Sequence, residues 1–276
     1  MFDKLLQPLA QRWLAHPPSV WGKLPSHGDY VRHRVTPAQA QAWQQWVRQV
    51  WHLRPEAISL PKPRASRKRA PSAAGWISLE PRQDTVDLGA VPVAFVMLPG
   101  TLPFAATHYV QGVIVASEDQ VGRSCPLIMY QQVSSRWMSK MWATPAGQRA
   151  SSGQDLLYGL SRLGARLHAS DKDWSDLVHA VDGLWDLYQP GWPQLWGGPP
   201  MAVASAAQRR WLDGYCAAEE LDTARQLHGV QHLPWVNWPA RLLRAEQPVP
   251  AFWQQDMRGG YINASESLLK LWGVRP

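Results

Sequence analysis

The segment GKLPSHGDYVRH at residues 22–33 holds the densest group of side chains able to do chemistry. His27 and Asp29 lie two residues apart, so an imidazole and a carboxylate could form an acid–base pair, with Ser26 as a nearby hydroxyl. The same residues are typical of a tight turn, in which Gly28 takes a positive φ and Asp29 accepts hydrogen bonds from backbone amides. We favour the turn, because no oxyanion donor or third partner for the pair is evident.

A second polar segment, EDQVGR at residues 118–123, sets two acids and Arg123 around Gly122. It offers too few oxygen ligands for calcium and is typical of a solvated hairpin turn with an internal ion pair. His228 and His232 have the spacing of two zinc ligands on a helix, but the Glu of H-E-x-x-H is absent. We therefore predict no metal site, no cofactor and no catalytic residue.

The composition bounds the class of protein. The 276 residues are 45% hydrophobic and 18% charged, which suits one or two globular domains and excludes a disordered chain. The formal net charge is +7. Much of it comes from one acid-free stretch, which contains Lys62, Arg64, Arg67, Lys68 and Arg69. A nucleic-acid-binding face spread over the fold is therefore not indicated.

Localisation is predicted from three further features. Cys125 and Cys216 lie far apart and form no C-x-x-C motif, so a reduced compartment fits better than a disulfide framework. Residues 88–117 contain no charged side chain, but prolines interrupt the run, and a spanning helix needs about 20 continuous apolar residues. Charged residues also interrupt the N-terminal segment, which excludes a signal peptide. We expect a cytoplasmic protein without a membrane span.

Two N-terminal helices are predicted. Apolar side chains recur at helical spacing over residues 2–14 and form one stripe, made of Phe2, Leu5, Leu6, Leu9 and Trp13. We expect this stripe to pack either on its own domain or on a partner protein, and packing on its own domain is the simpler interpretation. Thr36 as N-cap and Pro37 at the first position predict a helix over 37–51 that buries an aromatic face against a sheet.

The rest of the chain predicts a sheet and further helices. Apolar runs at 93–98, 109–116 and 126–133 have the composition of strands, and their short connections favour antiparallel pairing. The expected helices are 155–168, a helix capped by Asp173 or Ser170, 205–228 and 265–272, and further strands are expected at 240–245 and 251–255. The fold class is therefore α/β (α+β), with a central, mainly antiparallel sheet flanked by helices.

The 17 tryptophans are predicted to serve two roles. Trp43, Trp46, Trp174 and Trp185 recur on apolar helix faces and are expected in the core. Exposed tryptophans in the Trp192–Trp196 loop would mark a protein interface, because tryptophan is enriched there. Stacking of tryptophans on nucleic-acid bases is the other interpretation, given the basic stretch.

Two blocks of the sequence resemble the type VI secretion-associated TagF (ImpM) family in content and order. They are GKLPSHGDYVRHRVTPAQAQAWQQWV and PVAFVMLPGTLPFAATHYVQGVIVASEDQVGRSCPL. His27 stands where the family usually has Arg, and Tyr30 where it has Phe. The family's signature positions correspond here to Gly22, Lys23, Leu24, Pro25, Gly28, Asp29, Arg32, Asp119, Val121, Gly122, Arg123 and Pro126.

The resemblance implies a cytoplasmic accessory protein, not an enzyme. Proteins of this family act as post-translational negative regulators of type VI secretion and engage a forkhead-associated (Fha) scaffold component. The family fold is α/β, with a central antiparallel sheet flanked by helices. The implied organisation is an N-terminal extension helix within 1–18 and one TagF-like domain over 19–276, with a basic loop insert at about 61–75.

We expect the two signature loops at one end of the sheet. There, Asp29 and Asp119 would pair with Arg32 or Arg123 and form a structural corner that is also part of a partner face. Two other functions stay open on the sequence alone. One is nucleic-acid binding through residues 62–69, and the other is a small hydrolase that uses His27 and Asp29.

Overall fold

One antiparallel sheet organises the part of the chain that the structure describes. The computed structural model describes residues 2–51, 91–142, 152–167, 173–196, 239–255 and 260–273. Within them, seven strands lie in the order β2-β1-β5-β4-β3-β6-β7, and each neighbouring pair is antiparallel. The strands are β1 Ser19–Gly22, β2 Val31–His33, β3 Val93–Met97, β4 Tyr109–Val115, β5 Leu127–Val133, β6 Ala251–Gln255 and β7 Tyr261–Ser265. The predicted fold class is confirmed.

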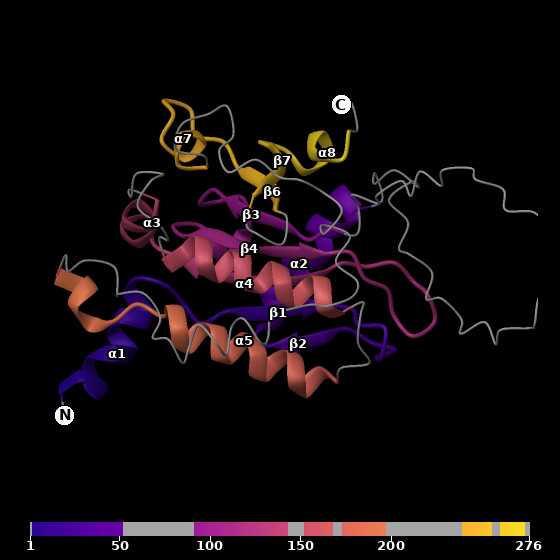
Figure 1. Cartoon of the computed structure of the whole chain (residues 1–276), viewed down its shortest axis with the longest axis horizontal. Coiled ribbons are helices and arrows are strands. Elements are labelled where there is room, and N and C mark those ends of the chain that lie inside the picture. Colours follow the sequence, from indigo (N-terminus) through magenta and orange to yellow (C-terminus); the bar gives the residue numbers. More distant parts are fainter. Residues whose placement is uncertain are drawn as a thin grey trace, which may run out of the picture.

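Helices cover both faces of this sheet (Figure 1). One face packs against α3, α4 and α5, and the other against α2, η4 and α8. The helices are α1 Phe2–Trp13, α2 Pro37–Val50, α3 Ser135–Met141, α4 Ser152–Leu167, α5 Trp174–Tyr188, α7 Ala240–Leu243 and α8 Leu268–Leu271, with the 3-10 helices η4 Pro103–Ala105 and η5 Trp192–Trp196. The described helices include none that is both long and apolar enough to cross a bilayer.

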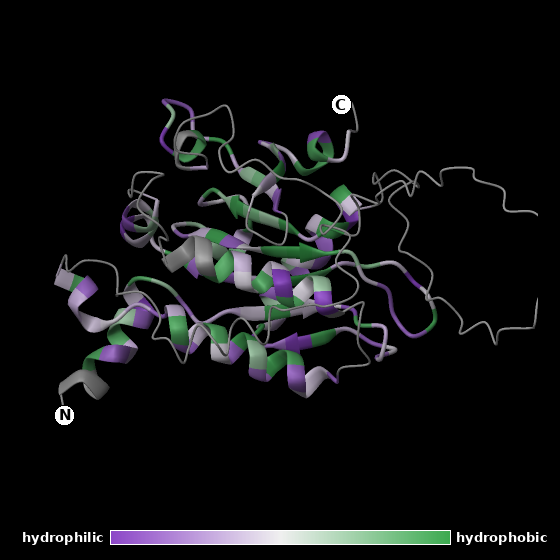
Figure 2. Cartoon of the chain, in the orientation of Figure 1, coloured by the Kyte–Doolittle hydropathy of each residue, from purple (hydrophilic) through white to green (hydrophobic). Residues whose placement is uncertain are grey.

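The central strands are buried on both faces. In β3, Ala94 and Val96 join the core beneath α4, while Val93, Phe95 and Met97 join the core beneath α2. Successive side chains of a strand point to opposite faces, so a strand covered on both sides is apolar at every position. Figure 2 shows the middle of the sheet mostly in the hydrophobic colour for this reason.

Helix α2 confirms the prediction made from its cap. The Thr36 side chain accepts a hydrogen bond from the Gln39 amide at 3.3 Å, and the Gln39 side chain accepts one from the Thr36 amide at 2.9 Å. On its buried face, Trp43 contacts Phe95 and Tyr130 edge-on, with ring centroids 6.0 and 5.0 Å apart. This aromatic cluster fixes α2 on the sheet over β3 and β5.

Helix α1 docks on its own domain, but not through the predicted stripe. Ala10 and Leu14 are the buried residues of its last turns, and the Leu14 carbonyl accepts a 2.8 Å hydrogen bond from the Ser134 amide. Leu9 and Trp13, which belong to the predicted stripe, are 44% and 65% exposed. The stripe prediction was wrong at these positions, because α1 buries the neighbouring row that contains Ala10 and Leu14.

Other predictions need correction as well. The segment predicted as a strand at 240–245 is helix α7, which begins after Pro239, whose carbonyl accepts from the amides of Leu242 and Leu243. Strand β2 and helix α3 were not predicted, since three and seven residues are too few for a periodic pattern. Several predicted features lie outside the described residues: the basic insert at 61–75, the helix at 205–228, Cys216, His228 and His232.

Candidate functional site

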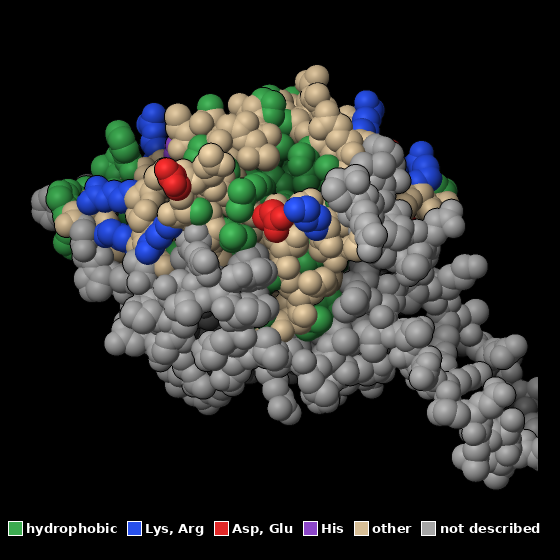
Figure 3. Space-filling model, turned by 90° about the horizontal axis from the view of Figure 1, so that it is seen from above, with side chains coloured by type: hydrophobic (Ala, Val, Ile, Leu, Met, Phe, Trp, Pro, Cys, Tyr) green, Lys and Arg blue, Asp and Glu red, His purple; other side chains and the backbone are tan. Residues whose placement is uncertain are grey.

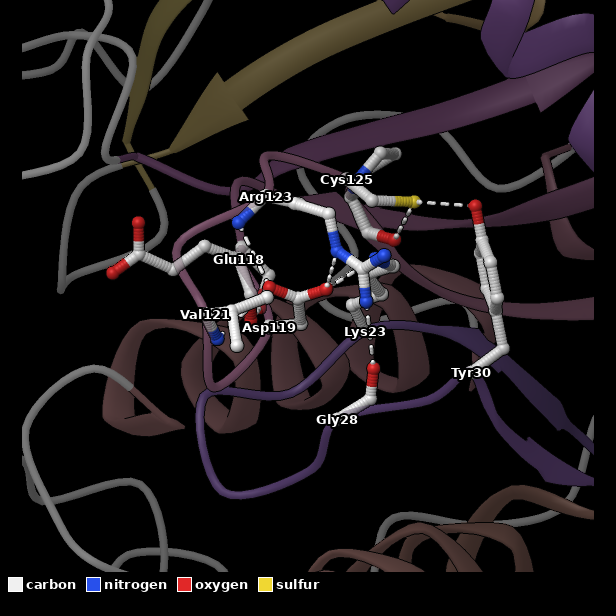
Figure 4. A network of polar contacts seen from close by, with 10 residues as sticks. Lys23, Gly28, Tyr30, Glu118, Asp119, Val121, Arg123 and Cys125 are labelled. Atoms are coloured by element: carbon white, nitrogen blue, oxygen red, sulfur yellow. Dashed lines mark hydrogen bonds and ion pairs between the residues drawn. The ribbon is translucent and has the colours of Figure 1, made fainter.

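The two signature loops meet at one end of the sheet (Figure 4). One loop joins β1 to β2, and the other joins β4 to β5. Because β1 pairs antiparallel with β5, the end of β1 lies beside the start of β5. The Gln120 amide donates to the His27 carbonyl at 3.1 Å, and Arg123 Nη2 donates to the Gly28 carbonyl at 3.2 Å. The second contact joins residues that lie 95 positions apart in the sequence.

We call the region where the two loops meet, residues 23–30 and 117–125, the corner. Asp119 lies at its centre. Its Oδ2 lies 2.5 Å from Lys23 Nζ and accepts from Arg123 Nε at 2.6 Å. Its Oδ1 accepts from the backbone amides of Val121 and Arg123, at 3.1 and 2.8 Å. The Asp119 side chain is completely buried. One carboxylate therefore fixes both the turn of its own loop and the lysine of the other loop.

The donors around Asp119 determine its charge. Burial by itself raises the pKa of a carboxyl group, because it disfavours the charged form. Here the hydrogen bonds from Lys23 and Arg123 outweigh burial and hold the pKa of Asp119 well below its usual range. Asp119 is therefore an ionised acceptor in the folded protein, with no proton to give at neutral pH.

Lys23 is a buried cation with an aromatic neighbour. Its ammonium lies 5.2 Å from the centre of the Tyr30 ring, which stacks on Trp21 with centroids 5.1 Å apart. The Cys125 thiol donates to the Tyr30 hydroxyl at 3.8 Å. Burial raises the pKa of Cys125 to about 11 and that of Tyr30 to about 12, so both stay protonated at neutral pH.

Glycine has a different role in each part of the corner. Gly22 has φ +141°, and a Cβ there would lie 2.2 Å from the Pro126 carbonyl oxygen, so only glycine lets β1 approach β5 this closely. Gly122 has φ +81° in the turn of the β4–β5 loop. Gly28 is not among the positive-φ glycines, so that prediction was wrong. Its contribution is the carbonyl oxygen that receives Arg123.

The ion pairs differ from those predicted. Arg123 pairs with Asp119, as one of the predicted alternatives had it, and the additional partner is Lys23. Asp29 and Arg32 are exposed, and within the described part of the chain neither makes an ion pair. The prediction that Asp29 pairs with an arginine was therefore wrong. The missed signal was a lysine placed directly between the end of a buried strand and Leu24, where an ammonium needs a buried acid.

The outer surface of the corner is made by a few exposed residues. Val121 is 72% exposed at the tip of the β4–β5 loop, and the Arg123 side chain is 64% exposed. Pro25 is exposed on the β1–β2 loop, whereas Leu24 is buried beneath it. Figure 4 shows the Glu118 side chain pointing away from the network. The corner thus joins a fixed charged interior to a small mixed apolar and basic surface.

The residues of the hydrolase hypothesis are not arranged as an acid–base pair. His27 Nδ1 lies 2.9 Å from Ser26 Oγ, and no contact joins His27 to Asp29 within the described residues. These three residues lie on the β1–β2 loop, at the surface. Among the described residues, no group of three or more histidines, cysteines or acids has the arrangement of a metal site.

Comparison with known proteins agrees with the first of the two loop motifs. Residues 19–59 match the family model "TagF N-terminal domain, Type VI secretion system-associated". Among solved structures, the chain is similar to PA0076 from Pseudomonas aeruginosa PAO1, with 14% identity, a TM-score of 0.43 and coverage of 93% of this chain and 92% of that one. No curated protein sequence matches. Residues 19–59 therefore carry the N-terminal domain of the type VI secretion-associated TagF proteins, the family that the two loop motifs resemble.

Proposed function

We propose that this chain is a cytoplasmic accessory protein that represses the type VI secretion system after translation, by binding rather than by catalysis. Its partner would be an Fha-type scaffold component of the same system. The match to the TagF N-terminal domain supports the association with secretion. The repressor role and the partner come from the family resemblance.

The observation that carries the proposal is the locked geometry of the corner. Asp119 receives four hydrogen bonds, which hold the β4–β5 loop in one conformation and join it to Lys23. A surface that is already ordered loses less conformational entropy when a partner binds. The corner is therefore suited to recognition by a rigid face.

The exposed residues of the corner have interface chemistry. The Arg123 guanidinium is oriented by two contacts, from Nε to Asp119 and from Nη2 to the Gly28 carbonyl. An oriented guanidinium presents its outer N–H groups in a fixed fork, which suits a carboxylate or phosphate group. Val121 beside it offers an apolar contact at the loop tip. Arginine is enriched among the residues that dominate binding energy.

The ionisation states of the corner also support binding over catalysis. Asp119 is held as a carboxylate with all its partners in place, and Cys125 and Tyr30 are held protonated. A nucleophilic thiol needs a lowered pKa, whereas burial raises this one to about 11. The ionisable groups of the corner therefore stabilise structure and are poorly suited to proton transfer.

The test measures binding of the purified full chain to the purified Fha-type component by calorimetry. Val121→Ser removes the apolar contact from an exposed position without touching the Asp119 side chain. We expect its Kd to rise about tenfold, the scale of an interface hot spot, with an unchanged melting temperature. The matched control is Trp196→Ser, an exposed apolar residue at the end of η5, which should bind as the wild type does.

Two results would contradict the proposal. One is a wild-type chain that does not bind the Fha-type component at all. The other is a Val121→Ser variant that binds with wild-type affinity while Trp196→Ser loses binding, which would move the partner face to the opposite end of the sheet.

A further inference from the structure

The opposite end of the sheet carries exposed aromatic side chains. They come from α1 and η5, which lie side by side at the left in Figure 1. Gln7 Nε2 donates to the Pro190 carbonyl at 2.9 Å, and Gln11 Nε2 donates to Gln189 Oε1 at 2.8 Å, so α1 is fixed against the segment that leads into η5. The exposed apolar residues here form what we call the tryptophan patch: Leu9, Trp13, Trp192 and Trp196.

The side chains of the tryptophan patch are unusually exposed to solvent for large apolar groups. Trp13 and Trp196 are 65% and 67% exposed, although burying an indole is one of the largest hydrophobic gains available to a chain. Trp192 and Trp196 contact each other edge-on, with centroids 5.9 Å apart. On α1, Leu9 and Trp13 stand one turn apart, so they share the outward face of the helix.

Four basic side chains accompany the patch, and we call them the basic rim: Arg12, Arg136, Lys140 and Arg244. Lys140 Nζ donates to the Gln194 carbonyl of η5 at 3.2 Å, and Arg244 Nη2 donates to the Ser139 carbonyl of α3 at 3.0 Å. Figure 3 shows basic side chains gathered with hydrophobic ones at the left end of the molecule.

The rim keeps a net positive charge. Helix α5 beside it carries Asp176, Asp182 and Asp186, and Glu246 follows α7. Of these acids, Asp182 is paired with His33 and Arg34 of the β2 end. Within the described part of the chain, no carboxylate lies in ion-pair distance of Arg12, Arg136 or Arg244. The charge of these guanidinium groups is therefore available to an external anion.

We propose that the tryptophan patch and the basic rim bind the surface of an anionic lipid bilayer. Indole rings partition to the headgroup level of a membrane, where the ring is apolar and its N–H is hydrated. Lysine and arginine near the surface are attracted by anionic headgroups. Helix α1 would lie parallel to the bilayer with Leu9 and Trp13 toward the acyl boundary, as amphipathic interfacial helices do.

Two other occupants fit the surface less well. A second copy of the chain would bring two basic rims together, and like charges across an interface disfavour association. A protein partner would need a complementary pocket for each indole. The rings of Trp13 and Trp196 project from two different elements, and a headgroup layer accepts such rings without a matched shape.

The test is co-sedimentation of the full chain with phosphatidylcholine vesicles, with and without about a quarter phosphatidylglycerol. We expect binding to the anionic vesicles only. Trp13→Ser with Trp196→Ser, and separately Arg136→Gln with Arg244→Gln, should each weaken it about tenfold or more. Arg32→Gln is the matched control, since Arg32 is an exposed arginine on β2 without an ion pair in the described residues.

Several results would overturn the proposal. They are absent binding, binding unchanged in both double variants, or an equal loss in Arg32→Gln. Deleting residues 62–69 removes the other basic segment, and complete loss of vesicle binding on that deletion would assign the activity there. If the tryptophan double variant converts a dimer to a monomer in light scattering, a second copy covers the patch. Val121→Ser should leave vesicle binding unchanged, which separates this test from that of the proposed function.

Discussion

The two ends of the sheet differ in whether their basic side chains are paired with a carboxylate. At the end that carries the two signature loops, here the signature end, Lys23 and Arg123 both contact Asp119, which is completely buried. At the other end, Arg136 and Arg244 have no carboxylate partner among the described residues, and exposed tryptophans stand beside them. Neutralised charge inside the protein thus fixes a loop, whereas charge left on the surface can attract a ligand.

The difference has an energetic consequence. Removing one partner of a buried ion pair is strongly destabilising, because it leaves an uncompensated charge in the protein interior, where water cannot solvate it. Removing an exposed cation costs little, because water replaces its contacts. Stability should therefore be sensitive to substitutions at the signature end and insensitive at the tryptophan end. The following variants test that contrast, in order of decreasing expected effect.

Gly22→Ala should be the most damaging single change in the two signature loops. The new Cβ would lie 2.2 Å from the Pro126 carbonyl oxygen and 2.7 Å from Leu127 Cα, at a backbone φ of +141°. Backbone strain and overpacking together predict a loss of about 4 kcal/mol in the free energy of unfolding, measured with denaturant. Gly28→Ala is the control on the same loop, because its Cβ meets nothing within 4 Å, and we expect a change of about 0.5 kcal/mol or less. Equal losses for both alanines would show that close approach of β1 to β5 is not what the corner requires.

Lys23→Met should be the next largest effect. Methionine keeps the apolar stem and removes the ammonium from Asp119, so the carboxylate stays buried with less compensation, and we expect a loss of about 3 kcal/mol. Lys270→Met is a matched control, because Lys270 and Glu266 also lie 2.5 Å apart, but both are about half exposed. The control should lose about 0.5 kcal/mol or less. A loss in Lys270→Met as large as in Lys23→Met would remove burial as the cause of the contrast.

The same pair predicts how stability depends on pH. The pKa of Asp119 is lowered in the folded state, so its contribution is present above the ordinary value of 3.8 and is lost as the pH falls below it. Hydrogen bonding to Lys270 also lowers the pKa of Glu266, which adds a smaller loss in the same direction. Denaturant unfolding from about pH 6 to about pH 3 should show a steeper fall for the wild type than for Lys23→Met. Parallel curves would mean that Lys23 does not set the acidity of Asp119.

Local chemistry made much of the fold predictable. The Thr36–Pro37 start of α2, the apolar runs of β3, β4 and β5, and the Asp173 cap of α5 follow from rules that act within a few residues. Short elements such as β2 and α3 depend on tertiary contacts, because three or seven residues carry too little pattern. The face that α1 buries also depends on its neighbours, since Ala10 and Leu14 fit the sheet better than the more apolar stripe.

The location of the candidate site was predictable from the sequence, but its ion-pair partners were not. Two glycine- and acid-containing loops next to paired strands indicate one corner, and the structure brings them together. Which acid pairs with which cation depends on burial, which the sequence does not specify. Asp119 is enclosed between the two hairpins and Asp29 is exposed, although each lies within three residues of a glycine in its loop. The lysine that completes the network was a motif residue without a predicted role.

The smallest expected effect on stability is at the tryptophan end. Trp13→Ser with Trp196→Ser should change the free energy of unfolding by about 0.5 kcal/mol or less, because both rings are about two-thirds exposed and bury little surface. Substituting the buried Trp43 instead should cost about 3–5 kcal/mol, since it packs against Phe95 and Tyr130. A large loss in the double variant would mean that the exposed rings stabilise α1 and η5, and are not held outward for a ligand. A negligible loss, measured in the same denaturant series, would leave binding as the physical reason to keep two indoles in water.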